Sequence, residues 1–425
     1  MKNIVKNVVI ILEKDVLEQE LHIGRSGDLV ILKHFFERCC KVFVVTAQSM
    51  QINEFGNLES LNLNIIEDIQ CKAENIYNKS TYQEYLNILN GNLPSYGVTP
   101  EMHTRIIIKP CKFNEIGSID ILLSRAMPQS LTEQFLLNFQ KLKEFAEIAP
   151  QNMAEICLYK DKAIPYLLQN NPKNLSLIYE KYSQKLVKFK NEITKDYSSL
   201  AIETIIIDAT QSHSEIEKVL TKIPLPVCIK PFNLFGGVGV GVFQNYSDAL
   251  NHFKKINNEF EKYQINEKRL VLAQKAVKTP EFGDIRALFS YGKFLGAFKR
   301  YEPIGQIHNT INGAMIIPVS DFEFNFANEF EENLRKPFIE AIHLLKSLFL
   351  ESEFLKSEFI CGCDFLLDHT LFKLTEINIA CPTGFVFLEA SLLCIKYGRE
   401  LNIEDLNEYF STNGHFFDNI LTDLS

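Results

Sequence analysis

One stretch near the carboxyl end of the chain, residues 360–384, constrains the fold most strongly. It contains two apolar and β-branched runs, Cys361–Leu367 and Leu371–Asn378, separated by the polar residues Asp368–Thr370. Two such runs joined by a short polar turn predict a β-hairpin. The carboxylates within these runs are the first clue to chemistry, because isolated charges are costly to bury.

The predicted hairpin brings potential metal ligands together. With the turn centred on His369, Asp364 lies opposite Leu374. Alternation of side chains then places four residues on one face: Asp364, Leu374, Glu376 and Asn378. Asp364 and Glu376 become diagonal neighbours, about 7–8 Å apart at the backbone. Two carboxylates and an amide oxygen suit Mg²⁺, with Mn²⁺ as an alternative, and leave positions open for phosphate. The competing interpretation is a solvated strand face.

Composition excludes several classes of protein. A chain of 425 residues with 46% apolar and 23% charged residues predicts two or three globular domains. A net charge of −9 without a basic tail argues against nucleic acid as a partner. Ten scattered cysteines without a CxxC pair indicate reduced thiols and a cytoplasmic protein. The apolar run Val8–Leu12 is too short for a signal peptide, and no stretch is long enough to span a membrane.

The amino-terminal part alternates strand and helix signals. Strands are predicted at Asn7–Leu12, Lys41–Thr46 and Ile119–Ser124, and a helix at Asp28–Arg38. This alternation predicts an α/β domain with a parallel, Rossmann-like sheet. The weakly patterned segment 50–104 is expected to form loops and short helices. No glycine-rich fingerprint follows the first strand, which argues against a dinucleotide site there.

The rest of the chain is predicted as helices followed by an α+β region. Helices are expected at Leu131–Ile148, Lys160–Gln169 and Leu175–Lys195, and later at Phe322–Leu350 and Phe385–Lys396. A polar helix near 402–411 closes the chain. A further helix is expected at Ser247–Tyr263. Further strands are expected at Thr204–Asp208, Val227–Lys230, Leu270–Gln274, Ile285–Ser290 and Phe294–Lys299.

The segment Phe235–Gly241, FGGVGVG, follows the strand VCIKP. It lacks the Gly-Lys-Ser/Thr of a Walker A loop, and the β-rich run after it does not fit a Rossmann turn. Two interpretations remain: a glycine hairpin whose backbone N–H groups cover a triphosphate, or a tight turn alone. Lys230 favours the first, because a lysine at that strand end can reach phosphate, although it can also be an edge-strand lysine.

Three weaker signals accompany this segment. Lys162 is by itself an ordinary helix lysine, and the strand end Gln274–Val277 can offer backbone hydrogen bonds to a planar base. Arg286 and Arg300 lie on two strands that a hairpin would bring to one end. There they would clamp phosphate or carboxylate, or else form ion pairs with Glu281 or Glu302.

Taken together, these motifs resemble the ATP-grasp fold, and most closely the prokaryotic glutathione synthetase family. The likeness rests on CIKP and the glycine segment, D-x-R at Asp284–Arg286, the FKR strand end, and NGA at Asn312–Ala314. Its most specific part is GCDFLL…LTEINIACPTG, and IDILLSRAMP adds Arg125 in the position of a substrate-contacting arginine. It covers residues 119 to 385 well and 1–118 poorly.

The resemblance implies ADP-forming ligation of a carboxylate to an amine through an acyl phosphate, with γ-glutamylcysteine and glycine as the leading pair. Arg286 and Arg300 would stabilise the transferring phosphate, and Asp364, Glu376 and Asn378 would bind the metal. Nucleotide contacts are implied for Lys162, Lys230, Gly236, Gly237, Val238, Gly239, Gln274, Lys275, Ala276 and Val277. Substrate contacts are implied for Arg125, Asn312, Gly313, Pro382 and Thr383.

The chain departs from the family in two respects. His308 stands where the family has an arginine in its mobile loop, and extra residues lie in 50–104 and 170–200. Another amino-acid or peptide ligase, a regulatory ATP-binding protein without turnover, and a kinase acting on a hydroxyl therefore stay open. The resemblance also implies small-molecule substrates and a homo-oligomer. The expected domains are an amino-terminal α/β domain (1–128), a helical connection (129–200), and two ATP-grasp subdomains (201–280 and 281–425).

Overall fold

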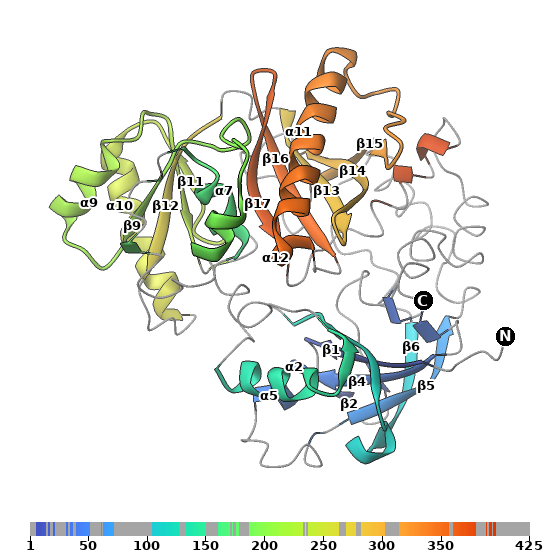
Figure 1. Ribbon diagram of the computed structural model, residues 1–425. Helices are drawn as coiled ribbons and strands as arrows, with labels where there is room; N and C mark the ends of the chain where they lie inside the picture. Colours follow the sequence, from blue (N-terminus) through green and yellow to red (C-terminus); the bar gives the residue numbers. More distant parts are fainter. Residues whose placement is uncertain are drawn as a thin grey trace. The chain divides into compact units, whose positions relative to one another are not determined.

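The predicted apolar strands form three sheets in the computed structural model of this protein (Figure 1). The chain divides into two units, Met1–Cys157 with Ala380–Ser425, and Leu158–Ile379. The structure describes residues 6–13, 16–17, 20–21, 31–32, 35–36, 40–51, 61, 63–71, 104–126, 133–149, 160–170, 172, 176–177, 187–232, 234, 237–262, 269–277, 282–301, 314–356, 360–379, 388, 391–392 and 394–396.

The first unit contains an eight-stranded sheet in the order β2-β3-β6-β5-β4-β1-β7-β8. Its centre is parallel, as predicted, with β1 (Asn7–Leu12) between β4 (Lys41–Thr46) and β7 (Ile119–Ser124). The middle of β1 is fully buried, as expected for a parallel strand covered on both faces. Helix α5 (Glu133–Lys143) contributes Phe135 and Phe139 to this core. The other elements are β2 (Val16–Leu17), β3 (Glu20–Leu21), α2 (Ala47–Gln51), β6 (Thr104–Cys111), the 3₁₀ helix η3 (Phe113–Glu115) and β8 (Ala146–Ile148).

Two predictions in this unit were wrong. The segment expected to form loops contains β5 (Leu63–Cys71), which pairs antiparallel with β4 and β6. The register of β5 shifts between Ile66 and Asp68, so the bulge interrupts the alternation by which a strand is recognised. The helix predicted to run to Ile148 ends at Lys143, and β8 follows. Three residues are too few to show a strand period.

The second unit contains a four-stranded antiparallel sheet in the order β11-β10-β12-β9. Two helices, α9 (His213–Leu220) and α10 (Tyr246–Lys262), bury the apolar side chains of one face. Alternation assigns Lys230 and Gln274 to the other face, because their strand neighbours Ile229 and Ala273 belong to the helix-covered core. The strands are β9 (Thr204–Asp208), β10 (Val227–Pro231), β11 (Gly241–Phe243) and β12 (Leu270–Lys275).

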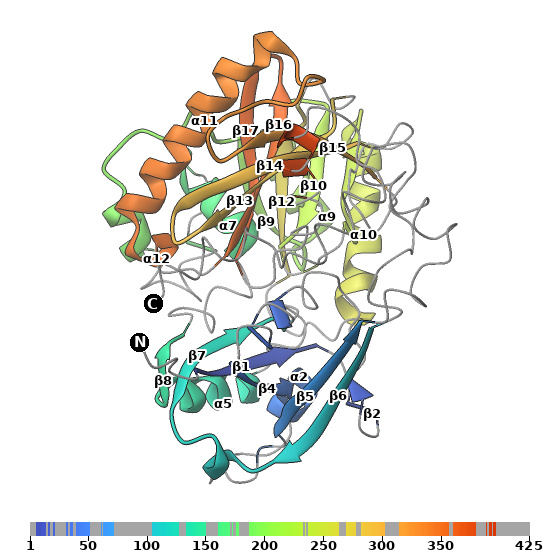
Figure 2. The ribbon, with the colours of Figure 1, turned by 90° about the vertical axis from the view of Figure 1, so that its right-hand side faces the viewer.

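A five-stranded antiparallel sheet in the order β15-β14-β13-β16-β17 completes the second unit. Both ribbon views show α11 (Glu332–Glu351) running along this sheet (Figures 1 and 2). Phe338 of α11 meets Phe372 of the sheet edge-on, with ring centroids 5.4 Å apart, so one face of the sheet is aromatic core. The strands and remaining helices are β13 (Asp284–Ser290), β14 (Lys293–Tyr301), β15 (Met315–Asp321), β16 (Cys361–Asp368), β17 (Leu371–Asn378), α7 (Lys160–Leu167) and α12 (Glu353–Lys356).

The long helix predicted from Phe322 begins ten residues later, at Glu332. Asp321 explains the delay, because its carboxylate accepts hydrogen bonds from the backbone N–H groups of Glu323 and Asn325. Such a turn competes with helix formation, and Phe324 adopts a left-handed φ of +63° within it. No helix in the described part of the chain is long and apolar enough to cross a membrane.

A short segment links the two sheets of the second unit. The carbonyl oxygen of Leu200 accepts a 2.8 Å hydrogen bond from the backbone N–H of Leu374 in β17. The neighbouring carbonyl of Ser199 accepts from the ammonium of Lys373, at 2.6 Å. Since β9 begins at Thr204, four residues further on, these bonds connect the start of the small sheet to the carboxyl-terminal hairpin.

We expect Gly283→Ala to destabilise the protein far more than Gly117→Ala. Both glycines have left-handed φ values, +90° and +76°. A Cβ at Gly283 would overlap the carbonyl oxygen of Arg300, whereas a Cβ at Gly117 meets nothing within 4 Å. Gly117→Ala should cost about 1–2 kcal/mol from backbone strain alone, and Gly283→Ala on the order of 3 kcal/mol or more. Urea unfolding followed by circular dichroism measures both. Equal losses would contradict this account of Gly283.

Candidate functional site

The carboxyl-terminal hairpin forms as predicted, but with a different register. Its turn holds two residues, because Asp368 pairs directly with Leu371, and His369 takes a φ of +60°. The register predicted from a turn centred on His369 was therefore wrong by one residue. Leu374 pairs with Phe365 instead of Asp364, and alternation places it on the opposite face from Asp364.

A β-bulge restores the alignment of the polar residues. The register shifts between Asp364 and Phe365, which leaves Thr375 as the extra residue of β17. The hydroxyl of Thr375 donates a 3.0 Å hydrogen bond to the backbone carbonyl of Asp364. Asp364 therefore lies directly opposite Glu376 and not diagonal to it, so the two residues are closer at the backbone than the sequence predicts.

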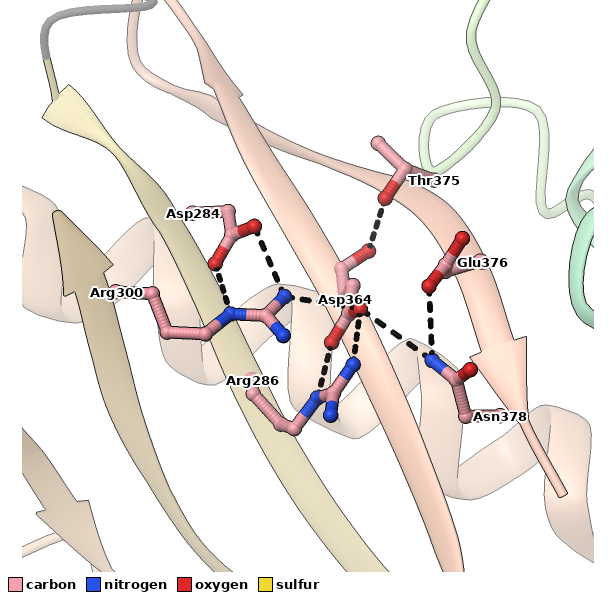
Figure 3. A network of polar contacts seen from close by, with 7 residues as sticks. All are labelled: Asp284, Arg286, Arg300, Asp364, Thr375, Glu376 and Asn378. Atoms are coloured by element: carbon pink, nitrogen blue, oxygen red, sulfur yellow. Dashed lines mark hydrogen bonds and ion pairs between the residues drawn. The ribbon is translucent and has the colours of Figure 1, made fainter. Parts of the chain in front are cut away.

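The neighbouring strand supplies a buried arginine to Asp364 (Figure 3). Arg286 of β13 is the register partner of Asp364 across the β13–β16 pair. Its Nε lies 2.7 Å from Asp364 Oδ1, and its Nη2 lies 2.6 Å from Oδ2. Both residues are almost fully buried, at 6% and 3% exposure. This is a bidentate guanidinium–carboxylate pair, a strong and directional form of charge-assisted hydrogen bonding.

Arg300 of β14 links two carboxylates. Its Nε and Nη2 lie 2.6 and 2.9 Å from the two oxygens of Asp284, its register partner in β13. The same Nη2 lies 2.9 Å from Asp364 Oδ2. The arginines were predicted to bind a ligand or to pair with Glu281 or Glu302. Those glutamates lie outside the described residues, and the pairing seen is with aspartates of the site itself.

Asn378 joins the two remaining ligand candidates, as Figure 3 shows. Its Nδ2 lies 3.3 Å from Asp364 Oδ2 and 3.0 Å from Glu376 Oε1. The three predicted metal ligands therefore do share one face of the hairpin and meet at their polar ends. That face is opposite the aromatic one covered by α11, because Asp364 alternates with Phe365 along β16.

The charges of this cluster do not balance. Asp284 and Asp364 pair with the guanidinium groups of Arg286 and Arg300, and Glu376 joins the cluster through Asn378, which leaves one negative charge if all are ionised. Burial raises the pKa of Asp364, but the two guanidiniums outweigh burial and hold that pKa below its ordinary value. Burial raises the pKa of Asp284 to about 6 against the attraction of Arg300, and the charge of Asp364 adds to the rise.

The donor chemistry of the cluster fits a hard divalent cation. The amide of Asn378 lies within hydrogen-bonding distance of both carboxylates, so the three groups are close enough to be offered to a single ion. A half-turn of the Asn378 amide would present its oxygen instead of its nitrogen. No group of three or more His, Cys, Asp or Glu side chains forms a metal site among the described residues, so this set depends on the amide.

The predicted base-contacting stretch is partly engaged by the protein itself. Gln274 is buried, and its Nε2 donates to the hydroxyl of Thr204 at 3.0 Å. The backbone N–H groups of Lys275 and Ala276 donate to the carbonyls of Glu203 and Pro226, both at 2.9 Å. Val277, which follows them, is half-buried. The N–H groups of Lys275 and Ala276 are therefore engaged within the protein, and hydrogen bonding of this stretch to a base stays a prediction.

The described part of the glycine segment forms a tight turn. The N–H of Val240 donates to the carbonyl of Gly237 at 3.1 Å, and Gly237 and Gly239 have φ values of +79° and +72°. Val238 lies between them and is half-buried. The strand β11 follows at once and pairs antiparallel with β10, an arrangement that both interpretations of the segment predict. Gly236 lies outside the described residues.

The other predicted contacts are placed only in part. Lys162 belongs to α7, as predicted, and the structure describes the helix but not that side chain. Arg125 is buried at the end of β7 in the first unit, where its N–H donates to the carbonyl of Ile11. Four predicted substrate contacts lie outside the described residues: Asn312, Gly313, Pro382 and Thr383.

Two residues of the cluster were not predicted to take part in it. Asp284 flanks the predicted strand, and the D-x-R spacing is the signal that places it on the same face as Arg286. Thr375 has no comparable signal, because its contribution arises from the bulge.

We expect the cost of Asp284→Asn to depend on pH. Since the folded pKa is raised to about 6, the folded chain keeps a proton that the unfolded chain has released between about pH 4 and pH 6. This contribution to stability is present at low pH and is lost as pH rises through 6. The penalty of the substitution should therefore be larger near pH 4.5 than near pH 7, by on the order of 2 kcal/mol.

Urea unfolding at the two pH values measures this difference, with Asp196→Asn as the control. The backbone N–H of Ser198 lowers the pKa of the exposed Asp196, so its contribution is lost as pH falls, the opposite trend. A penalty for Asp284→Asn that is constant with pH would contradict the raised pKa.

No protein-family model matches the chain, and no curated protein matches it. Solved structures similar to it include the crystal structure of D-cycloserine synthetase DcsG, with 11% identity, a TM-score of 0.48, and coverage of 92% of this chain and 100% of that one. A second is the VanG D-Ala:D-Ser ligase from Enterococcus faecalis, with 9% identity, a TM-score of 0.47, and coverage of 90% and 94%. A third is the D-alanine–D-alanine ligase from Helicobacter pylori, with 13% identity, a TM-score of 0.43, and coverage of 94% and 100%.

Proposed function

We propose that this chain is an ATP-grasp ligase that joins a carboxylate to an amine and forms ADP and phosphate. The leading substrates are γ-glutamylcysteine and glycine, which would make it a glutathione synthetase. The observation that carries the proposal is the convergence of Asp364, Glu376 and Asn378 with two buried arginines on one sheet face. Oxygen ligands beside guanidinium groups are what the transfer of a phosphoryl group requires.

The proposed reaction has two steps. A carboxylate oxygen of the first substrate attacks the γ-phosphorus of ATP, the bond to the bridging oxygen breaks, and ADP leaves. The amine of the second substrate then attacks the acyl carbon, phosphate leaves, and the amine releases a proton. Mg²⁺ held by the three ligands would neutralise the phosphate oxygens of the nucleotide. Arg286 and Arg300 would donate hydrogen bonds to the transferring phosphoryl group.

The small sheet would hold the rest of the nucleotide. Lys230 lies on the face opposite the core formed with α9 and α10, where its ammonium would meet phosphate oxygens as a point charge. The backbone N–H groups of Lys275 and Ala276 are already used, so we propose that the base hydrogen-bonds with Val277. The turn Gly237–Val240 would approach the triphosphate, and Lys162 would add a second positive charge.

Two alternatives differ in what they predict. A ligase with another amino-acid or peptide acceptor keeps the whole phosphate site, and the replacement of the family's loop arginine by His308 favours considering it. A regulatory protein without turnover would bind ATP but would not need the metal ligands. The presence of all three ligand candidates on one face favours a catalyst over a regulatory protein.

Release of phosphate from ATP tests the proposal directly. We expect ADP and phosphate to appear only when a carboxylate and an amine are both present, with γ-glutamylcysteine and glycine the most active pair. The screen should include other amino acids and the D-amino acids named for the similar structures. Turnover with a different pair keeps the ligase and refutes the glutathione assignment. Tight ATP binding without turnover on any pair supports the regulatory protein.

We expect Glu376→Gln to lower turnover by about 10–100-fold and to shift the magnesium dependence to higher concentrations. The substitution removes one ligand charge and keeps the shape of the side chain. Asp368→Asn is the matched control, because it removes a carboxylate from the same hairpin at the turn, away from the cluster. Steady-state rates over a magnesium titration measure both. Normal rates of Glu376→Gln at ordinary magnesium would refute the metal assignment.

A further inference from the structure

A histidine on helix α10 is bonded to the glycine turn. The Nε2 of His252 lies 2.8 Å from the carbonyl oxygen of Gly239. A carbonyl accepts hydrogen bonds and cannot donate, so Nε2 must carry the proton, whether the ring is neutral or charged. His252 is 13 residues away from Gly239 in sequence, and neither the metal cluster nor the predicted nucleotide residues require it.

The turn has little freedom to adjust. The hydrogen bond from Val240 to Gly237 closes a four-residue turn in which Gly239 is the third residue. Gly239 has a φ of +72°, whereas the φ of Val238, the second residue, is not positive. This is a type II turn, which requires glycine at the third position. An added Cβ at Gly239 would also lie 2.7 Å from Cγ of Pro231, at the end of β10. The turn conformation and the contact with Pro231 therefore both restrict the backbone at Gly239.

The imidazole is itself held in place. The ring of Phe243 in β11 lies against it, with centroids 4.9 Å apart. Gly241 makes room for this pair, because an added Cβ there would lie 2.6 Å from the Phe243 ring and 3.4 Å from His252 Nε2. Phe243 restricts the ring so that its N–H points at the Gly239 carbonyl and not at solvent.

We propose that His252 is a positioning residue for nucleotide binding, an inference that rests on the proposed function. By binding the Gly239 carbonyl, His252 draws that negative dipole toward α10. The turn then presents backbone N–H groups, not this carbonyl, to the phosphates. His252 does not contact the reacting atoms, so its loss weakens nucleotide binding and leaves the chemical step in place.

The test compares two substitutions of His252. His252→Phe keeps an aromatic ring against Phe243 but has no N–H, whereas His252→Gln keeps an N–H donor. Loss of one hydrogen bond should raise the Kd for a fluorescent ATP analogue, and the KM for ATP, by about 3–10-fold in His252→Phe. The kcat at saturating ATP should stay within about twofold of wild type, and His252→Gln should recover most of the affinity. Asn251→Ala, an exposed neighbour on α10, should bind like the wild type.

The possible results distinguish the role of His252 from the proposed function. Wild-type affinity in His252→Phe overturns the inference, and so does an equal loss in His252→Phe and His252→Gln, because that pattern indicates packing and not the hydrogen bond. Absence of analogue binding by the wild type refutes the proposed function itself. Binding by the wild type together with the Phe and Gln pattern above supports both.

Discussion

The register of the five-stranded sheet depends on the pairing of Asp364 with two arginines. A carboxylate at 3% exposure is stable in its charged form only when its partners approach it closely, and Arg286 and Arg300 do so at 2.6–2.9 Å. This demand fixes the register of three adjacent strands, because Arg286 must lie opposite Asp364 and Arg300 opposite Asp284. A slip of one residue in any strand would turn a charge toward the aromatic core around Phe338.

The same charges connect structure to the proposed chemistry. The cluster carries one net negative charge when all its groups are ionised. A divalent cation would change the net charge to plus one, and an anionic phosphate would then be attracted to the site. The guanidinium groups already point into the cluster, so they would not need to leave solvent to meet a phosphate. A site arranged in this way suits phosphoryl transfer, in which the positioning of charge matters more than a protein base.

The sequence predicted this face but not its geometry, and the reason is local. Which residues of one strand share a face follows from alternation, and that was sufficient for Glu376 and Asn378 of β17. Asp364 of β16 joins their face only because the bulge at Thr375 offsets the change in register. How they align depends on the number of residues in the turn at His369 and on the bulge at Thr375, and neither alters the apolar pattern. The arginine partners were missed for a similar reason. Pairing between β13 and β16 joins residues 78 positions apart, and no local pattern encodes it.

In the four-stranded sheet, too, alternation decides which face each polar side chain occupies, but there only one of the two polar side chains has a partner in the sheet. Its helix-covered face contains Ile229 and Ala273, and alternation places Lys230 and Gln274 on the other face. Gln274 is satisfied by Thr204, so its amide serves the sheet, while Lys230 carries a charge that no side chain of β9 or β12 in register with it can neutralise, since Leu272 and Ile206 lie beside it. Lys230 therefore has no acidic neighbour in register within the sheet, which agrees with the proposed role of its ammonium in meeting phosphate, and the glycine turn anchored by His252 begins seven residues after it.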